Sequence, residues 1–184
     1  MRRRSRTLIL CALFTALTAV GAFIRIPVPV VPFTLQFLFT TLAGLLLGGR
    51  AGAAAVFAYI LMGLAGVPVF AEGGGLGYVL RPSFGYLPGF ALGAFVTGTI
   101  ANQVREPRYG RLLAANFAGL GIVYVVGMAY CYLISNFYLG TPLGLWPLFL
   151  YCFVLAVPGD AVLCVAAAVL VRRLLPIMKR GGED

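Results

Sequence analysis

The sequence predicts an all-α integral membrane protein, folded as a bundle of six transmembrane helices. Of its 184 residues, 61% are hydrophobic and only 10% are charged, and the mean hydropathy is +1.00. These values lie outside the range of soluble domains of this length. Apolar runs of about 17 to 25 residues recur along the chain, each long enough to cross a hydrocarbon core of roughly 30 Å as a helix.

Six apolar runs with short breaks between them define the expected helices, and they place the whole chain, 1–184, in a single transmembrane domain. The runs are 7–24, 34–49, 51–66, 87–104, 112–135 and 147–171. The second and third are short for a complete crossing, and the break between them depends mainly on Gly48, Gly49, Arg50 and Gly52. A β-barrel is not expected, because it would show alternating segments of about ten residues.

The basic residues set the expected orientation of the bundle. If every run crosses the membrane, 12 of the 14 basic residues fall on the same side. They are Arg2, Arg3, Arg4, Arg6, Arg50, Arg105, Arg108, Arg111, Arg172, Arg173, Lys179 and Arg180. The positive-inside rule places this side, with both termini, in the cytoplasm. The net charge of +9 is then explained by topology and by attraction to anionic membrane lipid, without a nucleic acid partner.

The first run has a second interpretation as a cleaved signal peptide. RRRSR precedes LILCALFTALTAVGA, and the small residues near Gly21 and Ala22 could form a cleavage site. The PVPVVPF that follows is typical of a built turn and not of a mature N-terminus. It therefore favours a retained helix.

The residue types and motifs that the sequence lacks exclude several kinds of catalytic and binding site. The chain has no histidine, which excludes imidazole metal sites and hydrolases that use a histidine base. The four cysteines form no CxxC motif and lie in apolar runs, where we expect buried packing residues and no disulfide framework. The GGGLG at 73–77 lacks the Gly-Lys-Ser/Thr ending of a P-loop. We therefore predict no catalytic residue, metal or cofactor, and any ATP must be hydrolysed by a partner.

Asp160 is the strongest individual signal of a functional site. It lies near the middle of the last run, where an ionised carboxylate costs roughly 2.5 to 3.5 kcal/mol or more. Pro158 and Gly159 weaken the helix just before it, and a local opening would direct the carboxylate toward a cavity. The alternative is a structural role, in which Asp160 pairs with Arg81 or bonds backbone amides and locks helices together.

The stretch 67–90, VPVFAEGGGLGYVLRPSFGYLPGF, joins the third and fourth expected helices on the outer side. A connection of this length in a compact bundle is usually a lid or a binding loop, and its aromatics predict a structured loop that roofs a pocket. Arg81 is either a solvated loop residue or a donor for a substrate carboxylate. Tyr78, Phe84 and Tyr86 are either membrane-interface residues or walls of an apolar pocket.

Gln36 is a polar residue just inside the second run, two residues after Thr34. Its amide group both donates and accepts hydrogen bonds, which suits a ureido, amide or hydroxyl group of a ligand. A hydrogen bond between helices is an equal alternative.

Small residues recur at four-residue spacing, which predicts smooth helix faces for close packing. The sets are Gly44 and Gly48, then Gly85, Gly89 and Gly93, and finally Ala12 and Ala16. The glycine sets favour a scaffold role. The alanine face of the first helix serves either this bundle or another protein.

Four blocks in a fixed order carry a resemblance to a known family. They are IPVPVVPFTLQ, LAGLLLGGRAGAAAVFAYILMGLAGVPVF, PSFGYLPGF and PGD. Together they resemble the BioY family, the biotin-binding substrate-specificity subunits of energy-coupling factor (ECF) vitamin transporters. The likeness runs from about residue 8 to about residue 171.

The resemblance implies a six-helix subunit in the cell membrane of a prokaryote, with cytoplasmic termini and biotin held near the outer face beneath the long loop. It also implies an ECF transmembrane coupling subunit and two cytoplasmic ATPases as partners. In such subunits an Ala-x-x-x-Ala pattern in the first helix docks on the coupling subunit, and Ala12 and Ala16 match that pattern.

Biotin offers two ureido N–H donors, a ureido carbonyl, an apolar thioether ring and a tail that ends in a carboxylate. We therefore expect Asp160 to bind the ureido N–H groups and Gln36 to add a complementary polar contact. Tyr86 and Phe84 are expected to contact the apolar body, and Arg81 the tail carboxylate.

One departure from the family pattern keeps alternatives open. A lysine is expected three residues after the aspartate, and this chain has Leu163 there. Arg81 is thus either a counter-ion of Asp160 or a carboxylate clamp. Other interpretations are a subunit of this fold for a different vitamin or a small carboxylate-bearing solute, a membrane enzyme that uses Glu72 or Asp160, and a purely structural protein.

Overall fold

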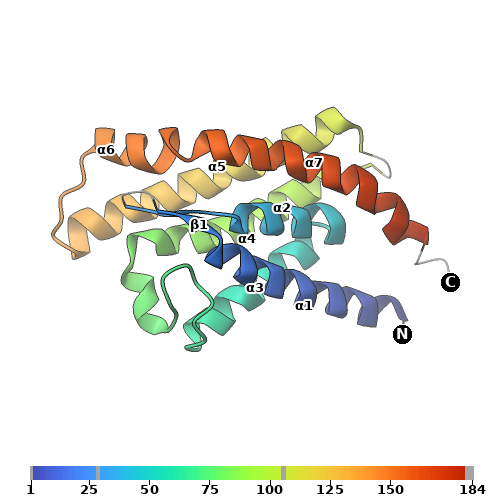
Figure 1. Ribbon diagram of the computed structural model, residues 1–184, viewed down its shortest axis with the longest axis horizontal. Helices are drawn as coiled ribbons and strands as arrows, with labels where there is room; N and C mark the ends of the chain where they lie inside the picture. Colours follow the sequence, from blue (N-terminus) through green and yellow to red (C-terminus); the bar gives the residue numbers. More distant parts are fainter. Residues whose placement is uncertain (1, 28–29, 105–106, 181–184) are drawn as a thin grey trace.

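Long helices that run side by side form the body of the protein (Figure 1). The structure is a computed structural model, and it describes residues 2–27, 30–104 and 107–180. The α-helices are α1 (Arg2–Phe23), α2 (Gln36–Leu47), α3 (Gly49–Leu64), α4 (Tyr86–Ala101), α5 (Tyr109–Leu133), α6 (Leu145–Phe149) and α7 (Val157–Arg180). The start of α1 and the end of α7 lie at the same end of the bundle (Figure 1).

Shorter elements lie between the long helices. β1 (Arg25–Ile26) and β2 (Phe33–Thr34) pair as antiparallel strands, with Arg25 opposite Thr34. The 3₁₀-helices η1 (Leu76–Leu80) and η2 (Pro82–Gly85) precede α4. The π-helical turns η3 (Ile134–Tyr138) and η4 (Leu150–Val154) follow α5 and α6.

Within the described residues, four helical segments are long and apolar enough to cross a membrane. They are Arg4–Phe23, Pro82–Ala101, Tyr109–Tyr138 and Leu145–Leu175, and α2 and α3 are shorter apolar helices. The expected run 147–171 lies in the last of these segments, where the structure divides it among α6, η4 and α7. The protein is a mostly helical integral membrane protein.

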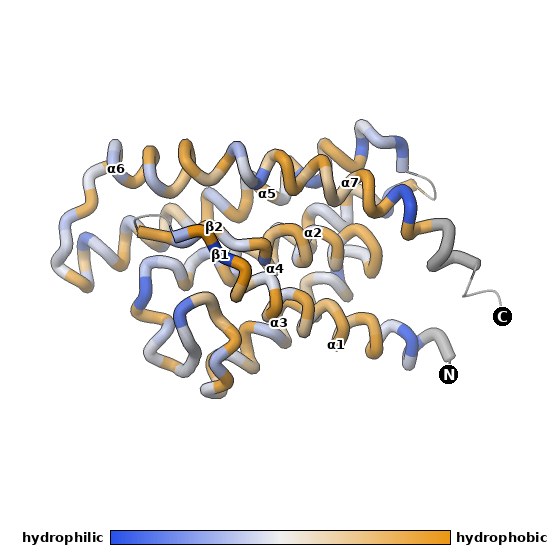
Figure 2. Tube along the Cα trace, viewed as in Figure 1, coloured by the Kyte–Doolittle hydropathy of each residue, from blue (hydrophilic) through white to orange (hydrophobic). Residues whose placement is uncertain are grey.

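The outer faces of the helices are apolar, as contact with lipid requires. Large hydrophobic side chains are exposed on α1, α3, α5 and α7, for example Leu8, Phe57, Val125 and Val162. Figure 2 shows hydrophobic residues along these helices, and hydrophilic ones near the end of the bundle where α1 starts.

Glycines bring η2 and α4 into close contact with α5. A Cβ atom on Gly85 would lie 2.2 Å from the Tyr130 side chain, and one on Gly89 would lie 3.1 Å from the carbonyl oxygen of Val123. The glycine face predicted on the fourth helix therefore packs against α5. Gly48 was expected to form a packing face with Gly44, and this is wrong. It has φ +86°, and a Cβ atom added to it would meet no other atom within 4 Å. It makes the turn between α2 and α3 in a conformation that few other residues adopt, and it forms no packing face.

Replacing Gly119 by alanine is expected to destabilise the bundle. Its Cβ would lie 2.0 Å from Thr97 Oγ1 and 3.0 Å from the carbonyl oxygen of Gly93. The Thr97 hydroxyl donates to the carbonyl of Ala115 at 3.1 Å, which restrains its movement. Overpacking of this kind costs about 1 to 3 kcal/mol, so Gly119→Ala should lower the thermal unfolding temperature in detergent.

Gly121→Ala, on the same helix, is the matched control. Gly121 is exposed and has no atom within 4 Å of an added Cβ, and alanine favours the helix by about 1 kcal/mol over glycine. This variant should match or exceed the stability of the unmodified protein. Equal melting temperatures for the two variants would contradict the packing described for Gly119.

Candidate functional site

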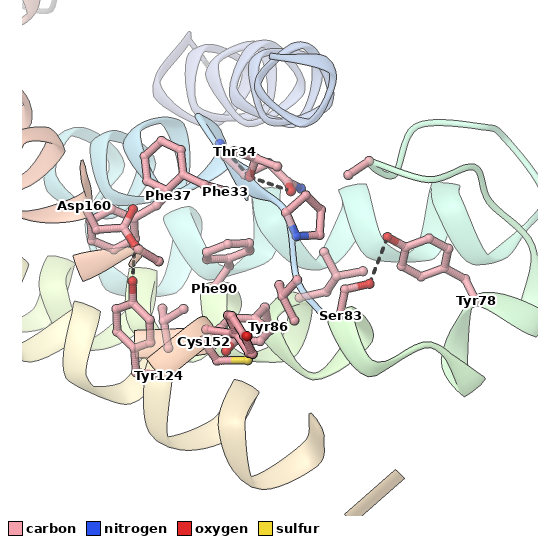
Figure 3. A pocket seen from close by; sticks show the side chains of 18 residues that line it. Phe33, Thr34, Phe37, Tyr78, Ser83, Tyr86, Phe90, Tyr124, Cys152 and Asp160 are labelled. Carbon is pink, nitrogen blue, oxygen red and sulfur yellow. Dashed lines mark hydrogen bonds between the residues drawn. The ribbon is translucent and has the colours of Figure 1, made fainter. Parts of the chain in front are cut away.

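A cavity lies between the β1–β2 segment, the loop after α3, and helices α2, α4, α5 and α7 (Figure 3). The space between its lining atoms is about 630 Å³, which includes the open mouth. Its lining residues are Val31, Pro32, Phe33, Thr34, Gln36, Phe37, Ala71, Tyr78, Ser83, Tyr86, Leu87, Phe90, Val123, Tyr124, Tyr151, Cys152, Ala156 and Asp160. Most are apolar or aromatic, and a few carry polar groups.

Asp160 forms one polar end of the cavity. Its side chain is buried, and the Tyr124 hydroxyl donates a 2.5 Å hydrogen bond to Asp160 Oδ2. Asp160 lies in the first turn of α7, because the helix begins at Val157 after a turn. The amides at a helix N-terminus carry partial positive charge, which favours a carboxylate. The acid thus lies in the first turn of α7, within the longer helical segment Leu145–Leu175.

The alternative in which Asp160 pairs with Arg81 is wrong. Among the described residues, the one ion pair joins Arg81 Nη1 to Glu72 Oε2 at 3.1 Å. Leu163, where a lysine was expected, is partly buried and packs against the apolar core. The carboxylate of Asp160 is held by the Tyr124 hydroxyl and has no ion pair with a described residue.

Gln36 lines the cavity and anchors a hydrogen-bond network. Its Nε2 donates to the Tyr59 hydroxyl at 2.7 Å, and its Oε1 accepts from Thr34 Oγ1 at 3.1 Å. The Tyr59 hydroxyl in turn donates to the carbonyl of Val69 at 3.0 Å. One N–H and one lone pair of the amide remain for another partner. The network joins β2, α2, α3 and the loop after α3.

Aromatic rings form the middle of the cavity. Tyr86 and Tyr124 meet edge to face, with ring centroids 6.3 Å apart and planes at 89°. Phe37 and Phe90 are also buried and line the same space. The Tyr86 hydroxyl is buried and has no hydrogen-bond partner among the described residues. These rings offer an apolar surface that suits a flat, apolar ligand body.

Tyr78 and Ser83 form a second polar end. Both residues are buried, and the Tyr78 hydroxyl lies 3.4 Å from Ser83 Oγ, with either group able to donate. In Figure 3 these two side chains lie on one side of the view, and Asp160 and Tyr124 lie on the other. Phe90 and Tyr86 lie between the two ends (Figure 3). The cavity therefore has an acid at one end, hydroxyls at the other and rings between them.

The loop after α3 folds back onto the bundle through backbone and ring contacts. Phe70 is buried and forms an isolated β-bridge with Gly73. Gly75 donates its N–H to the carbonyl of Gly63 at 2.7 Å. A Cβ on Gly63 would lie 2.1 Å from the Phe70 ring, so only glycine admits the ring there. These contacts position Ala71 and the residues that follow against the cavity.

The structure brings three of the predicted ligand residues together and leaves two apart. Gln36, Tyr86 and Asp160 line the cavity. Phe84 is partly buried behind its wall, with its ring 5.7 Å from that of Tyr130. Arg81 is 51% exposed and lies with its guanidinium carbon 5.9 Å from the centroid of the Tyr78 ring. Arg81 thus lies over the face of a ring that lines the cavity.

Ala12 and Ala16, the predicted partner-binding residues, are both exposed on α1. Residues four apart on a helix lie on the same face. Neither residue lines the cavity. The alanine face is therefore exposed and separate from the cavity.

Sequence reasoning missed Tyr124, Tyr59 and Ser83. The signal available for Tyr124 was a hydroxyl inside the long apolar run 112–135, which requires a partner when buried. Its partner, Asp160, is 36 residues away and becomes adjacent only through the packing of α5 against α7.

Comparison with known proteins places the chain in a family. Over residues 1–180 it matches the BioY family. It is 47% identical over 173 residues to the probable biotin transporter BioY of Lysinibacillus sphaericus, covering 94% of this chain and 88% of the relative. It is 46% identical over 134 residues to the biotin transporter BioY of Thermotoga maritima, covering 72% of this chain and 76% of the relative.

A solved structure gives the same result. The fold resembles the crystal structure of the S-component for biotin from an ECF-type ABC transporter, with a TM-score of 0.81 and 28% sequence identity. The similarity covers 95% of this chain and 93% of that one. With the family match over nearly the whole length, these likenesses show that the chain belongs to the BioY family.

Proposed function

We propose that this chain captures biotin in the cavity described above and serves as the substrate-binding subunit of an ECF-type transporter, and not as an enzyme. The observation that carries this function is the cavity itself, with a carboxylate at one end, hydroxyls at the other and aromatic walls between them. Membership of the BioY family supports the identity of the ligand.

The groups of the cavity match those of biotin one by one. The Asp160 carboxylate accepts hydrogen bonds from the ureido N–H groups, and Tyr124 holds it in place. Gln36 gives its remaining N–H as a complementary polar contact. Tyr86 contacts the apolar body, and Phe84 supports that wall from behind.

The valerate tail extends toward the second polar end. Tyr78 and Ser83 offer hydroxyl donors there, and Arg81 supplies positive charge from over the face of the Tyr78 ring. To bind the carboxylate directly, Arg81 breaks its exposed ion pair with Glu72 and forms one with the ligand. An exposed ion pair of this kind is worth only about 0 to 1 kcal/mol, so the exchange is easy.

The proposed setting is the plasma membrane of a prokaryote. We propose one domain, 1–184, that crosses the membrane six times, with both termini in the cytoplasm and the structured loop between the third and fourth helices outside. The basic residues of the sequence support this orientation, and Figure 2 shows hydrophilic residues near the end of the bundle where α1 starts. Membrane lipid then covers the exposed apolar side chains.

Uptake against a gradient needs partners. We propose a transmembrane coupling subunit and two cytoplasmic ATPase subunits, as in ECF transporters, with the exposed Ala12 and Ala16 face of α1 as the docking surface. Small side chains allow close helix approach.

Calorimetric titration of the purified protein in detergent tests the ligand. Biotin is expected to bind tightly, biotin methyl ester more weakly because it lacks the tail charge, and riboflavin and thiamine not at all. Binding of another vitamin in place of biotin would support the alternative, a subunit of this fold with a different substrate. No heat from any ligand, with a folded bundle confirmed by circular dichroism, would refute capture of biotin.

Asp160→Asn is expected to weaken biotin binding. The change keeps the shape of the side chain and removes the charge that strengthens its hydrogen bonds, which are worth about 1.5 to 3 kcal/mol. The dissociation constant should rise roughly 10- to 150-fold in the same titration. Tyr124→Phe keeps the ring and removes only the hydroxyl that orients the carboxylate, so its effect should be smaller. Unchanged affinity in Asp160→Asn would rule out the ureido contact.

Replacing Ala12 and Ala16 together by leucine is expected to abolish uptake by the assembled transporter while biotin binding to the isolated subunit persists. The larger side chains block close approach of the coupling subunit, and both positions lie away from the cavity. Ala114→Leu, an exposed alanine on α5, is the matched control. Normal co-purification of the double variant with its partners would remove this face as the docking surface.

A further inference from the structure

A second, more open hollow adjoins the cavity at the loop after α3. One wall is formed by Phe23 and Arg25, where α1 ends and β1 begins, and the other by Pro68 and residues 70–73 of the loop after α3. We call it the outer hollow. Ala71 lines both the outer hollow and the cavity, so the two spaces adjoin at this residue.

Arg25 is connected to the cavity from two directions. Its Nη1 donates a hydrogen bond to the carbonyl of Ala71. In the antiparallel pair it lies opposite Thr34, which lines the cavity and donates to Gln36. The charged side chain is thus held at the boundary between the outer hollow and the ligand site.

The charge of Arg25 is not neutralised by an ion pair in the part of the chain that the structure describes. The single salt bridge found there is between Arg81 and Glu72, so the nearby acid already has a partner. Arg25 is exposed, and its contact with Ala71 is to a neutral carbonyl. A guanidinium has five N–H donors in a planar fork, and carboxylates bind it more strongly than neutral carbonyls do.

The rest of the outer hollow suits an aliphatic chain next to that charge. Phe23, Pro68 and the ring of Phe70 line it. Glu72 lines it too, with its carboxylate paired to Arg81. An exposed cation beside apolar walls fits a carboxylate at the end of a hydrocarbon tail. Such a charge also raises the rate at which an anion arrives.

We propose that Arg25 and the outer hollow form a capture site for the carboxylate end of the ligand, which binds there before it occupies the cavity. The guanidinium exchanges the Ala71 carbonyl for the carboxylate, and the apolar walls receive the aliphatic tail. This inference rests on the proposed function, because it takes biotin as the ligand. It adds a site that acts on the rate of association, whereas Asp160 and the ring walls act on the bound state.

The test is stopped-flow association, followed by intrinsic tyrosine fluorescence, with biotin and with the uncharged biotin methyl ester. Non-ionic detergent is used, so that lipid phosphates do not compete for Arg25. For the unmodified protein at low salt, biotin is expected to associate about tenfold faster than the ester, and the ratio should fall as salt is added. In Arg25→Gln the ratio of the biotin rate to the ester rate should be close to one. Arg25→Lys keeps the charge, so it should keep most of the difference between the two rates.

Each other outcome overturns the inference in a recognisable way. A biotin-to-ester ratio in Arg25→Gln equal to that of the unmodified protein would show that Arg25 does not capture the carboxylate. Loss of binding of both ligands in Arg25→Gln would assign the residue a structural role through Ala71. Equal rates for both ligands in the unmodified protein would reject the capture site and leave biotin binding intact, whereas no binding of biotin at all would reject the proposed function as well.

Discussion

A carboxylate inside the membrane-spanning part of a protein must be held by hydrogen-bond donors, because lipid offers none. Asp160 meets this requirement through the Tyr124 hydroxyl and through its place in the first turn of α7. The rest of the site depends on this pair, because it joins α5 to α7 at one end of the cavity. The aromatic walls and the hydroxyls of the opposite end are arranged relative to that fixed point.

Rings placed on glycines give the cavity its shape. A Cβ on Gly127 would lie 2.6 Å from the Tyr86 ring, and one on Gly159 would lie 2.8 Å from the Phe33 ring. Each ring therefore occupies the space that any other side chain at the glycine would fill. This explains why glycines recur near a ligand site in a chain where most also serve helix packing. The rings can lie where they do because Gly127 and Gly159 have no side chains.

Some of the site followed from the sequence alone because a polar residue in an apolar run is conspicuous. Asp160 and Gln36 were identifiable for that reason, and Tyr86 from its place after the outer loop. Tyr124 was not, because α5 carries several tyrosines and only the rotation of that helix decides which one meets Asp160. The partner of Arg81 was missed for a different reason: Glu72 is nine residues away, and the fold of the loop brings the two side chains together. Contacts that depend on tertiary packing cannot be predicted from the separation of two residues along the chain.

The π-helical turn η4 (Leu150–Val154) has a consequence for how relatives of this chain are aligned. A π turn holds one residue more than an α turn, and it presents Tyr151 and Cys152 to the cavity. Loss of one residue here would restore an α turn and rotate the preceding segment by roughly 100° about the helix axis. Tyr151 would then leave the ligand site although every residue around Asp160 is unchanged. A one-residue gap at this point in an alignment therefore marks an altered wall of the cavity, and not a change of loop length.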